Sequence, residues 1–122
     1  MINIYYIYQL FIHWFADFVL QTDEQAKKKS TSITMLTYHV LVYTLVWAVA
    51  SYFYFHDVGK CLIFAGITGI CHWITDFVTS RVQKPFWDKK DYHNGFVLVG
   101  FDQVLHYIQL DMTIKWVQNL VL

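Results

Sequence analysis

The sequence predicts an all-α fold: a bundle of four transmembrane helices, made of two parallel helical-hairpin repeats within a single membrane domain over residues 1–122. Three observations lead to this prediction. Four apolar stretches approach the ~20 residues that a helix needs to cross a bilayer. Only 15% of the residues are charged, whereas a soluble domain carries about 25%. A short motif with histidine and aspartate also occurs in two of the four stretches.

The four predicted spans cover about residues 2–21, 32–55, 60–80 and 94–114. The first is interpreted as a retained helix, because it lacks the basic start and small-residue cleavage site of a signal peptide. Residues 22–31 are polar, residues 55–59 form a tight turn, and residues 81–93 contain the only proline, Pro85. A soluble bundle is the alternative, but it needs polar stripes along its helices, and residues 40–55 have none.

The distribution of basic residues predicts the orientation. The connections at 22–31 and 81–93 contain seven of them: Lys27, Lys28, Lys29, Arg81, Lys84, Lys89 and Lys90. The opposite side has only Lys60 and Lys115. Short basic loops stay in the cytoplasm, so both termini are predicted outside and the lipid bilayer is the expected partner. The sequence has no stripe of basic residues, so nothing in it suggests nucleic-acid binding.

The motif occurs in the first and third spans. It reads His13-Trp14-Phe15-Ala16-Asp17-Phe18 and then His72-Trp73-Ile74-Thr75-Asp76-Phe77. A histidine and an aspartate four residues apart lie on one face of a helix, one turn apart. Because the first and third spans run in the same direction, the chain divides into two parallel hairpin repeats, about 1–55 and 60–122.

Ionisable residues within the spans are predicted to form one layer near the cytoplasmic face. They are His13, Asp17, His39, His72, Asp76, Asp102 and His106. At ~1.5 Å per residue, most of them lie roughly 6–12 Å deep. A lone aspartate at the centre of a transmembrane helix costs roughly 2.5–3.5 kcal/mol, so the three aspartates must be paired, hydrated or bound to a cation. Met35 stands where the first hairpin would carry the counterpart of Asp102, which makes the site asymmetric.

Imidazoles and carboxylates are ligands for zinc, iron or manganese, and we predict one or two divalent ions per chain. The predicted ligands are His13, Asp17, His39, His72, Asp76 and His106. Asp102 is the predicted general base for metal-bound water. Gln21 and Gln103 are expected to support the site through hydrogen bonds. The alternative is a purely structural set of His–Asp hydrogen bonds between helices.

The leading functional hypothesis is a metal-dependent hydrolase that acts on a lipid or amphiphile from the cytoplasmic side, with a homodimer as one way to enclose the substrate. No Ser-His or Cys-His arrangement suggests a covalent nucleophile. The alternatives are a proton or metal-ion transporter with a His/Asp relay, a di-iron oxidative enzyme, and a protein that ligates haem. Transport ranks lower because the outer halves of the spans hold almost no ionisable residues.

Several of these residues resemble those of a known family. They are His13, the run Ala16 to Asp23, Lys28, His39, His72, Asp76, Phe101-Asp102-Gln103 and His106. The chain is similar over nearly its whole length to small bacterial and phage integral membrane proteins catalogued as domain of unknown function 3307. The resemblance implies a protein of the bacterial cytoplasmic (inner) membrane and one shared site, without an activity. A looser likeness, in ligand types alone, is to seven-helix intramembrane zinc hydrolases of the ceramidase and adiponectin-receptor group.

Overall fold

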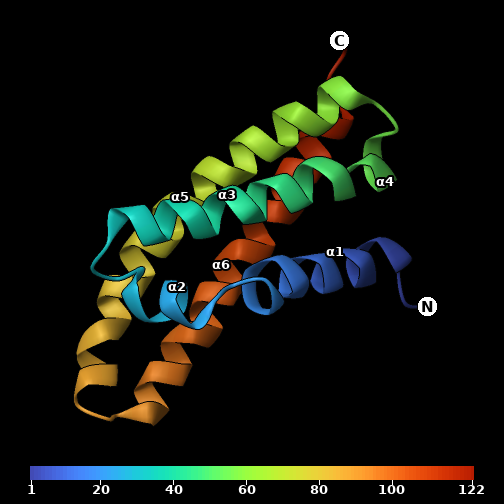
Figure 1. Ribbon diagram of the computed structural model, residues 1–122. Helices are drawn as coiled ribbons and strands as arrows, with labels where there is room; N and C mark the ends of the chain where they lie inside the picture. The colour runs from blue at the N-terminus through green and yellow to red at the C-terminus, as the bar shows by residue number, and fades with distance from the viewer.

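Every regular element is helical in the computed structural model, which describes residues 1–122 (Figure 1). The elements are α1 (Ile4–Trp14), the π-helix η1 (Phe15–Val19), α2 (Asp23–Lys28), α3 (Ile33–Ala50), α4 (Tyr52–Phe55), α5 (Val58–Asp88) and α6 (Tyr92–Gln118). The all-α prediction is confirmed. Two stretches, Ile33–Phe55 and Val58–Asp88, are long and apolar enough to cross a membrane. The four-span bundle and its two repeats stay predictions.

Side-chain caps define where the helices begin. The side chains of Asn3, Thr22, Ser32, Asp57 and Asp91 each accept a hydrogen bond from a backbone N–H in the first turn of the helix that follows. Such caps satisfy backbone donors that have no partner within the helix. Thr22 and Gln25 form a reciprocal capping box, which starts the short helix α2 inside the polar connection.

The structure differs from the predicted connection at residues 81–93. Helix α5 continues through Pro85 as far as Asp88, and α6 begins at Tyr92, so only three residues join them. Hydropathy indicates where a helix becomes polar and does not indicate where it ends. The reversal takes place at Lys90, whose φ of 60° is left-handed, and the ring of Trp87 packs closely against Gly95.

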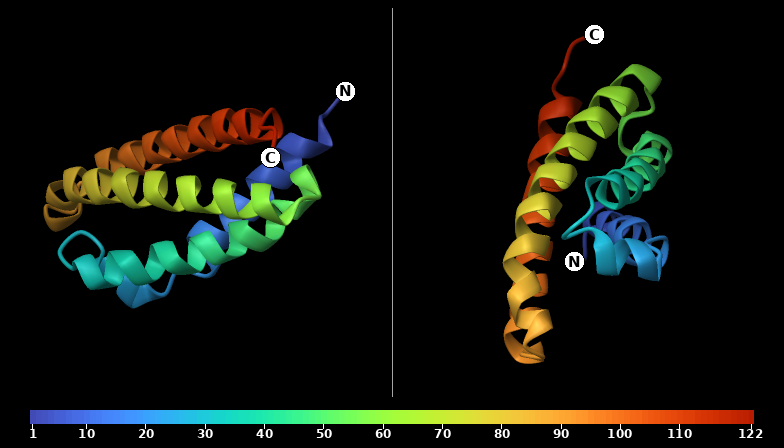
Figure 2. Two further views of the ribbon diagram at one scale, coloured as in Figure 1. Left: turned by 90° about the horizontal axis from the view of Figure 1, so that it is seen from above. Right: turned by 60° about the vertical axis from the view of Figure 1, so that its left-hand side comes forward.

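The helices run between two distinct ends of the molecule. Helices α5 and α6 lie antiparallel, and α3 packs along α5 (Figures 1 and 2). Both termini lie at the end where α4 turns into α5, whereas α2 and the α5–α6 connection lie at the other end. Hydrogen bonds from Tyr54 Oη to the Tyr5 carbonyl, 2.9 Å, and from Lys60 Nζ to the Gln118 carbonyl, 3.1 Å, join the elements at the terminal end. The seven basic residues of segments 22–31 and 81–93 therefore gather at the opposite end, which we call the lysine-rich end.

Helix α5 carries polar side chains on its buried face and apolar side chains on its exposed face. The buried row is Thr68, His72, Asp76 and Ser80, each at most 6% exposed. The exposed row is Ile70, Ile74, Val78 and Val82, each 50–65% exposed. Helices at the surface of soluble proteins have the reverse pattern, so this inverted polarity argues against the soluble bundle.

An apolar core fills the bundle between the polar layer and the terminal end. It contains Tyr43 and Trp47 of α3, Phe64 of α5, and Leu110 and Ile114 of α6. In each of these helices, the core residues lie between the buried histidine and the helix end that is nearest the chain termini. The polar layer is therefore closed off by side chains in that direction.

Gly69 lies where α5 crosses α3, and it provides a test of this packing. An added Cβ would overlap the hydroxyl of Thr44, which is held by a 2.7 Å hydrogen bond to the Val40 carbonyl. We expect Gly69→Ala to lower the free energy of unfolding by about 1–3 kcal/mol, the usual cost of overpacking. Gly66→Ala, on the same helix, meets nothing within 4 Å and is expected to stabilise by roughly 0.5–1 kcal/mol. Denaturant titrations in mixed micelles measure both, and equal shifts would contradict the close crossing.

Candidate metal centre

The structure brings all seven predicted ionisable residues together in the interior. His13, Asp17, His39, His72, Asp76, Asp102 and His106 are each 0–5% exposed. They come from α1, η1, α3, α5 and α6, so the site joins both halves of the chain. Buried charged groups at this density require close partners or a bound cation.

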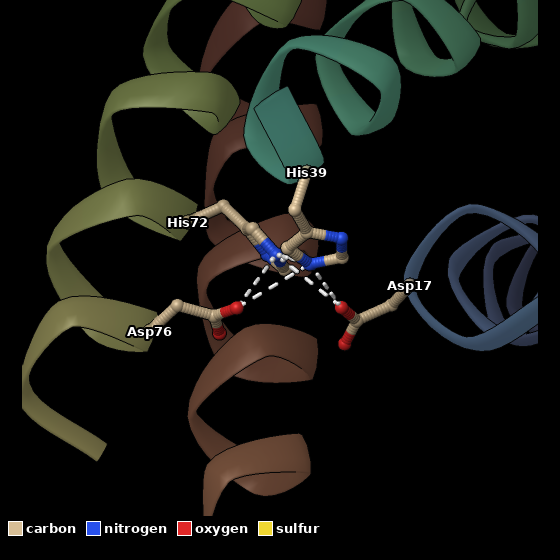
Figure 3. A group of neighbouring side chains, drawn as sticks. All are labelled: Asp17, His39, His72 and Asp76. Carbon is tan, nitrogen blue, oxygen red and sulfur yellow. Dashed lines mark hydrogen bonds and ion pairs between the residues drawn. The ribbon is translucent and has the colours of Figure 1, made fainter. Parts of the chain in front are cut away.

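Four ligand atoms from three segments converge on one point: Asp17 Oδ1, His39 Nε2, His72 Nε2 and Asp76 Oδ2 (Figure 3). The Nε2 atom of His39 lies 2.9 Å from Asp17 Oδ1 and 3.2 Å from His72 Nε2. It also lies 3.4 Å from Asp76 Oδ2. The Nε2 atom of His72 lies 3.4 Å from each of the two carboxylate oxygens.

These separations fit a tetrahedral ion. Four ligands about 2.0–2.1 Å from a tetrahedral zinc ion lie about 3.3–3.4 Å from one another. Five of the six separations range from 2.9 to 3.4 Å, and the sixth, between the two carboxylates, is within 4.8 Å. A proton on an imidazole nitrogen serves one carboxylate at a time, whereas an ion at the centre would serve all four atoms. The group can therefore hold a divalent metal ion.

His106 and Asp102 form the next layer of contacts. His106 Nε2 lies 3.0 Å from Asp76 Oδ1 and 3.3 Å from Asp102 Oδ2, so it orients the Asp76 carboxylate through the oxygen that faces away from the four-atom group. Asp102 accepts hydrogen bonds from Thr79 Oγ1, 2.6 Å, and Gln103 Nε2, 3.0 Å. Asp17, Asp102 and His106 also lie within metal-binding distance of one another, which gives a second candidate group.

His13 lies beside the four-atom group and is not part of it. Its Nδ1 faces Tyr43 Oη at 2.8 Å, and its Nε2 faces Gln103 Oε1 at 2.7 Å and Asp17 Oδ2 at 3.4 Å. Both ring nitrogens thus have other partners, and this arrangement suits a residue that holds Asp17 in place. Gln103 links His13 to Asp102, as expected of a supporting residue. Gln21 makes no such contact, and its buried Oε1 has no hydrogen-bond partner.

A cavity of about 470 Å³ leads from the lysine-rich end to this centre. It lies between α2 and the adjoining ends of α5 and α6, and it reaches Asp17 and Asp102. Lys27, Lys29 and Lys84 lie along its wall. This volume is typical of small-molecule sites, so the cavity can admit a ligand to the centre from the lysine-rich end.

One comparison with known proteins gives a match. The model of a family described as "Protein of unknown function (DUF3307)" matches residues 5–122. The chain belongs to this family. No curated protein and no solved structure matches it. The match includes every residue of the candidate metal centre, and the family description names no activity.

The DUF3307 chain holds Asp17 in a π-helix, which the sequence did not predict. Leu20 N donates to the Phe15 carbonyl at 3.0 Å, a wider turn than that of an α-helix. Single π-turns within helices often occur at functional sites, because they redirect a side chain. The second copy of the motif, with Asp76, lies in regular α-helix. The aspartates of the two copies therefore lie in different kinds of helix, Asp17 in a π-helix and Asp76 in an α-helix.

Lys29 has a role in this DUF3307 protein that the sequence did not predict. It belongs to the basic run expected to set the orientation, but its Nζ lies 3.1 Å from Asp76 Oδ2 and its side chain is only 19% exposed. Burial alone lowers the pKa of Lys29, but the carboxylates of Asp76 and Asp17 outweigh it and raise the pKa above its ordinary value. Lys29 is therefore a cation beside the centre. The only sequence feature near it was the basic run Lys27 to Lys29, which the prediction used for orientation alone.

Proposed function

We propose that this protein is a membrane-embedded metalloprotein in which Asp17, His39, His72 and Asp76 hold one divalent ion. The observation that carries the proposal is the convergence of the four atoms, five of whose six separations lie between 2.9 and 3.4 Å. Two imidazoles and two carboxylates in this geometry suit zinc best, because manganese and iron favour more ligands. His13 and His106 then act as residues that orient the two aspartates.

The charges at the centre support a single ion. With the carboxylates of Asp17, Asp76 and Asp102 ionised and the four histidines neutral, Lys29 leaves two negative charges uncompensated. One divalent ion neutralises them, and a second would leave an excess of positive charge in a low-dielectric interior. A centre with no net charge costs the least free energy to bury in such an interior.

A membrane location is supported by the inverted polarity of α5 and by the two stretches long enough to cross a bilayer. We propose that α1 with η1, α3 with α4, α5 and α6 all cross the bacterial cytoplasmic membrane. Both termini would lie outside, and the lysine-rich end with the cavity would face the cytoplasm. Rows of exposed apolar side chains would then contact lipid tails.

For the activity, we propose hydrolysis of an amphiphile that enters through the cavity. Because four protein ligands fill a tetrahedral shell, an ion held there would need to take a water molecule as a fifth ligand, and it would then lower the pKa of that water. Asp102 is the base that accepts the proton, because it lines the cavity and is oriented by Thr79 and Gln103. Transport ranks second, because the apolar core of Tyr43, Trp47 and Phe64 closes the polar layer on its other side.

Asp102→Asn separates binding from chemistry. We expect this variant to keep its ion and to lose hydrolysis by about 10²–10⁴-fold, the usual contribution of a general base. Elemental analysis measures the ion. Release of acid from a panel of amphiphilic carboxylic and phosphate esters in micelles measures the activity. Asp111→Asn is the matched control, since Asp111 lies on the same helix in an ion pair with Lys115.

Two outcomes would count against the proposed activity. Full turnover in Asp102→Asn would remove Asp102 as the base. If the unmutated protein hydrolyses no ester but moves metal ions or protons across proteoliposomes, transport replaces hydrolysis as the function.

A further inference from the structure

The cavity wall contains polar groups without partners. Ser80 is 6% exposed, lines the cavity, and its hydroxyl has no hydrogen-bond partner. The buried Oε1 of Gln21, which also lines the cavity, has none either. Nearly all buried polar groups in proteins are hydrogen-bonded, and the exceptions call for an explanation. An oxygen acceptor on a ligand would satisfy the Ser80 hydroxyl, whereas Gln21 Oε1 is itself an acceptor and would need a hydrogen-bond donor on the ligand.

The same wall carries an excess of available positive charge. Lys27 lines the cavity and pairs with no acidic residue, whereas its neighbour Lys28 pairs with Glu24 at 2.7 Å and lies outside the cavity. Lys29 projects to the centre, and Lys84 pairs with Asp88 at the cavity rim. An anionic ligand would therefore meet one free ammonium group and a second that also contacts Asp76.

The cavity also borders the apolar exterior. Phe18 forms part of its wall and is 43% exposed on the outside of the bundle. Val99 and Trp87 add apolar surface beside the polar groups. A ligand with a polar head and an apolar tail can thus place its head in the cavity while its tail leaves along the lipid-facing side.

We propose that this cavity binds the phosphate group of a phosphorylated amphiphile, with Lys27 and Ser80 as its main donors. A phosphate group carries up to two negative charges and several acceptor oxygens, which matches the ammonium of Lys27 and the hydroxyl of Ser80 along the cavity. The substrate class of the proposed hydrolase is then a phosphate ester, and this assignment rests on the proposed function. The phosphate site itself depends only on the cavity.

The experiment compares ligands and variants on the full chain in detergent micelles. The probes are phosphatidic acid, phosphatidylcholine, glycerol 3-phosphate and inorganic phosphate, and the readout is the dissociation constant from tryptophan fluorescence. We expect Lys27→Gln and Ser80→Ala each to weaken phosphatidic acid binding by roughly tenfold, as loss of a charge-assisted hydrogen bond does. Lys28→Gln is the matched control and should leave binding unchanged. Ser80→Ala should melt at the same temperature or higher, because it removes an unpartnered buried hydroxyl.

Each outcome has a defined meaning. Equal weakening by Lys28→Gln and Lys27→Gln would reduce the effect to general surface charge and overturn the proposal, as would unchanged binding in Ser80→Ala. Glycerol 3-phosphate bound as tightly as phosphatidic acid would support the phosphate site and assign it to a soluble ester. Metal content is measured on the same samples. Phosphate binding by a protein that holds no ion would therefore count against the metalloenzyme alone.

Discussion

Replacing His72 with alanine is expected to abolish tight metal binding. His72 supplies one of the four converging atoms, is fully buried, and stacks on Tyr43 with ring centroids 3.8 Å apart and on His106 at 4.3 Å. Loss even of a residue that only orients a ligand costs about 10–100-fold in affinity, so loss of a ligand should cost more than about 100-fold. Competition with a chromophoric zinc chelator measures the affinity. The truncation also leaves a cavity, which we expect to lower the free energy of unfolding by about 2–4 kcal/mol.

His93→Ala is the matched control for this variant. His93 is an exposed histidine near the start of α6, and its removal should change neither metal affinity nor stability. His39→Ala provides a second ligand variant if His72→Ala fails to fold. Zinc affinity equal to that of the unmutated protein in a folded His39→Ala or His72→Ala would contradict the four-atom site.

Asp76→Asn is expected to have the largest effect on stability in the metal-free protein. Asp76 is 1% exposed, and its carboxylate contacts His39, His72, His106 and Lys29. Removing its charge leaves the partly buried ammonium of Lys29 without its nearest counter-ion, and breaking a buried pair costs about 3–5 kcal/mol. We expect a loss at the lower end of that range, because Lys29 keeps some contact with solvent. Denaturant titrations in mixed micelles, with chelator present, measure the loss.

A second substitution tests the reason for that loss. Asp76→Asn combined with Lys29→Met should be more stable than Asp76→Asn alone, with a coupling energy of about 1–3 kcal/mol. Asp76→Asn combined with Lys28→Met should show no recovery, because Lys28 pairs with Glu24 at the surface. Additive effects of the Asp76 and Lys29 substitutions would mean that the 3.1 Å contact carries no energetic weight.

The sequence was sufficient to place the site because its spacing is local. A histidine and an aspartate four residues apart share a helix face, and the cost of burying them in apolar segments requires that they meet. Both copies of the motif accordingly have their Nε2 and Oδ2 atoms 3.4 Å apart. Counting residues along helices of known rise predicted that His39, Asp102 and His106 lie at similar levels, and the structure buries all three at the centre.

The parts that were missed depend on tertiary contacts. Nothing in the spacing of His13 indicates that Tyr43 and Gln103 occupy its two ring nitrogens. Lys29 reaches Asp76 because the capping box of Thr22 folds the connection back as α2, and hydropathy does not detect such a turn. The length of α5 was underestimated because its last turns are polar but remain helical and pack against α6 through Trp87 and Gly95.

The existence of the metal site is decided by the number of divalent ions that the unmutated chain holds. The protein would be purified in detergent without chelator, equilibrated with zinc, passed through gel filtration to remove loose ions, and submitted to elemental analysis. We expect close to one ion per chain, because one divalent charge balances the three carboxylates and Lys29. A value near zero would contradict the metalloprotein, and the buried histidines and aspartates would then form a hydrogen-bonded network alone. A value near two would contradict the charge balance and assign a second ion to Asp17, Asp102 and His106.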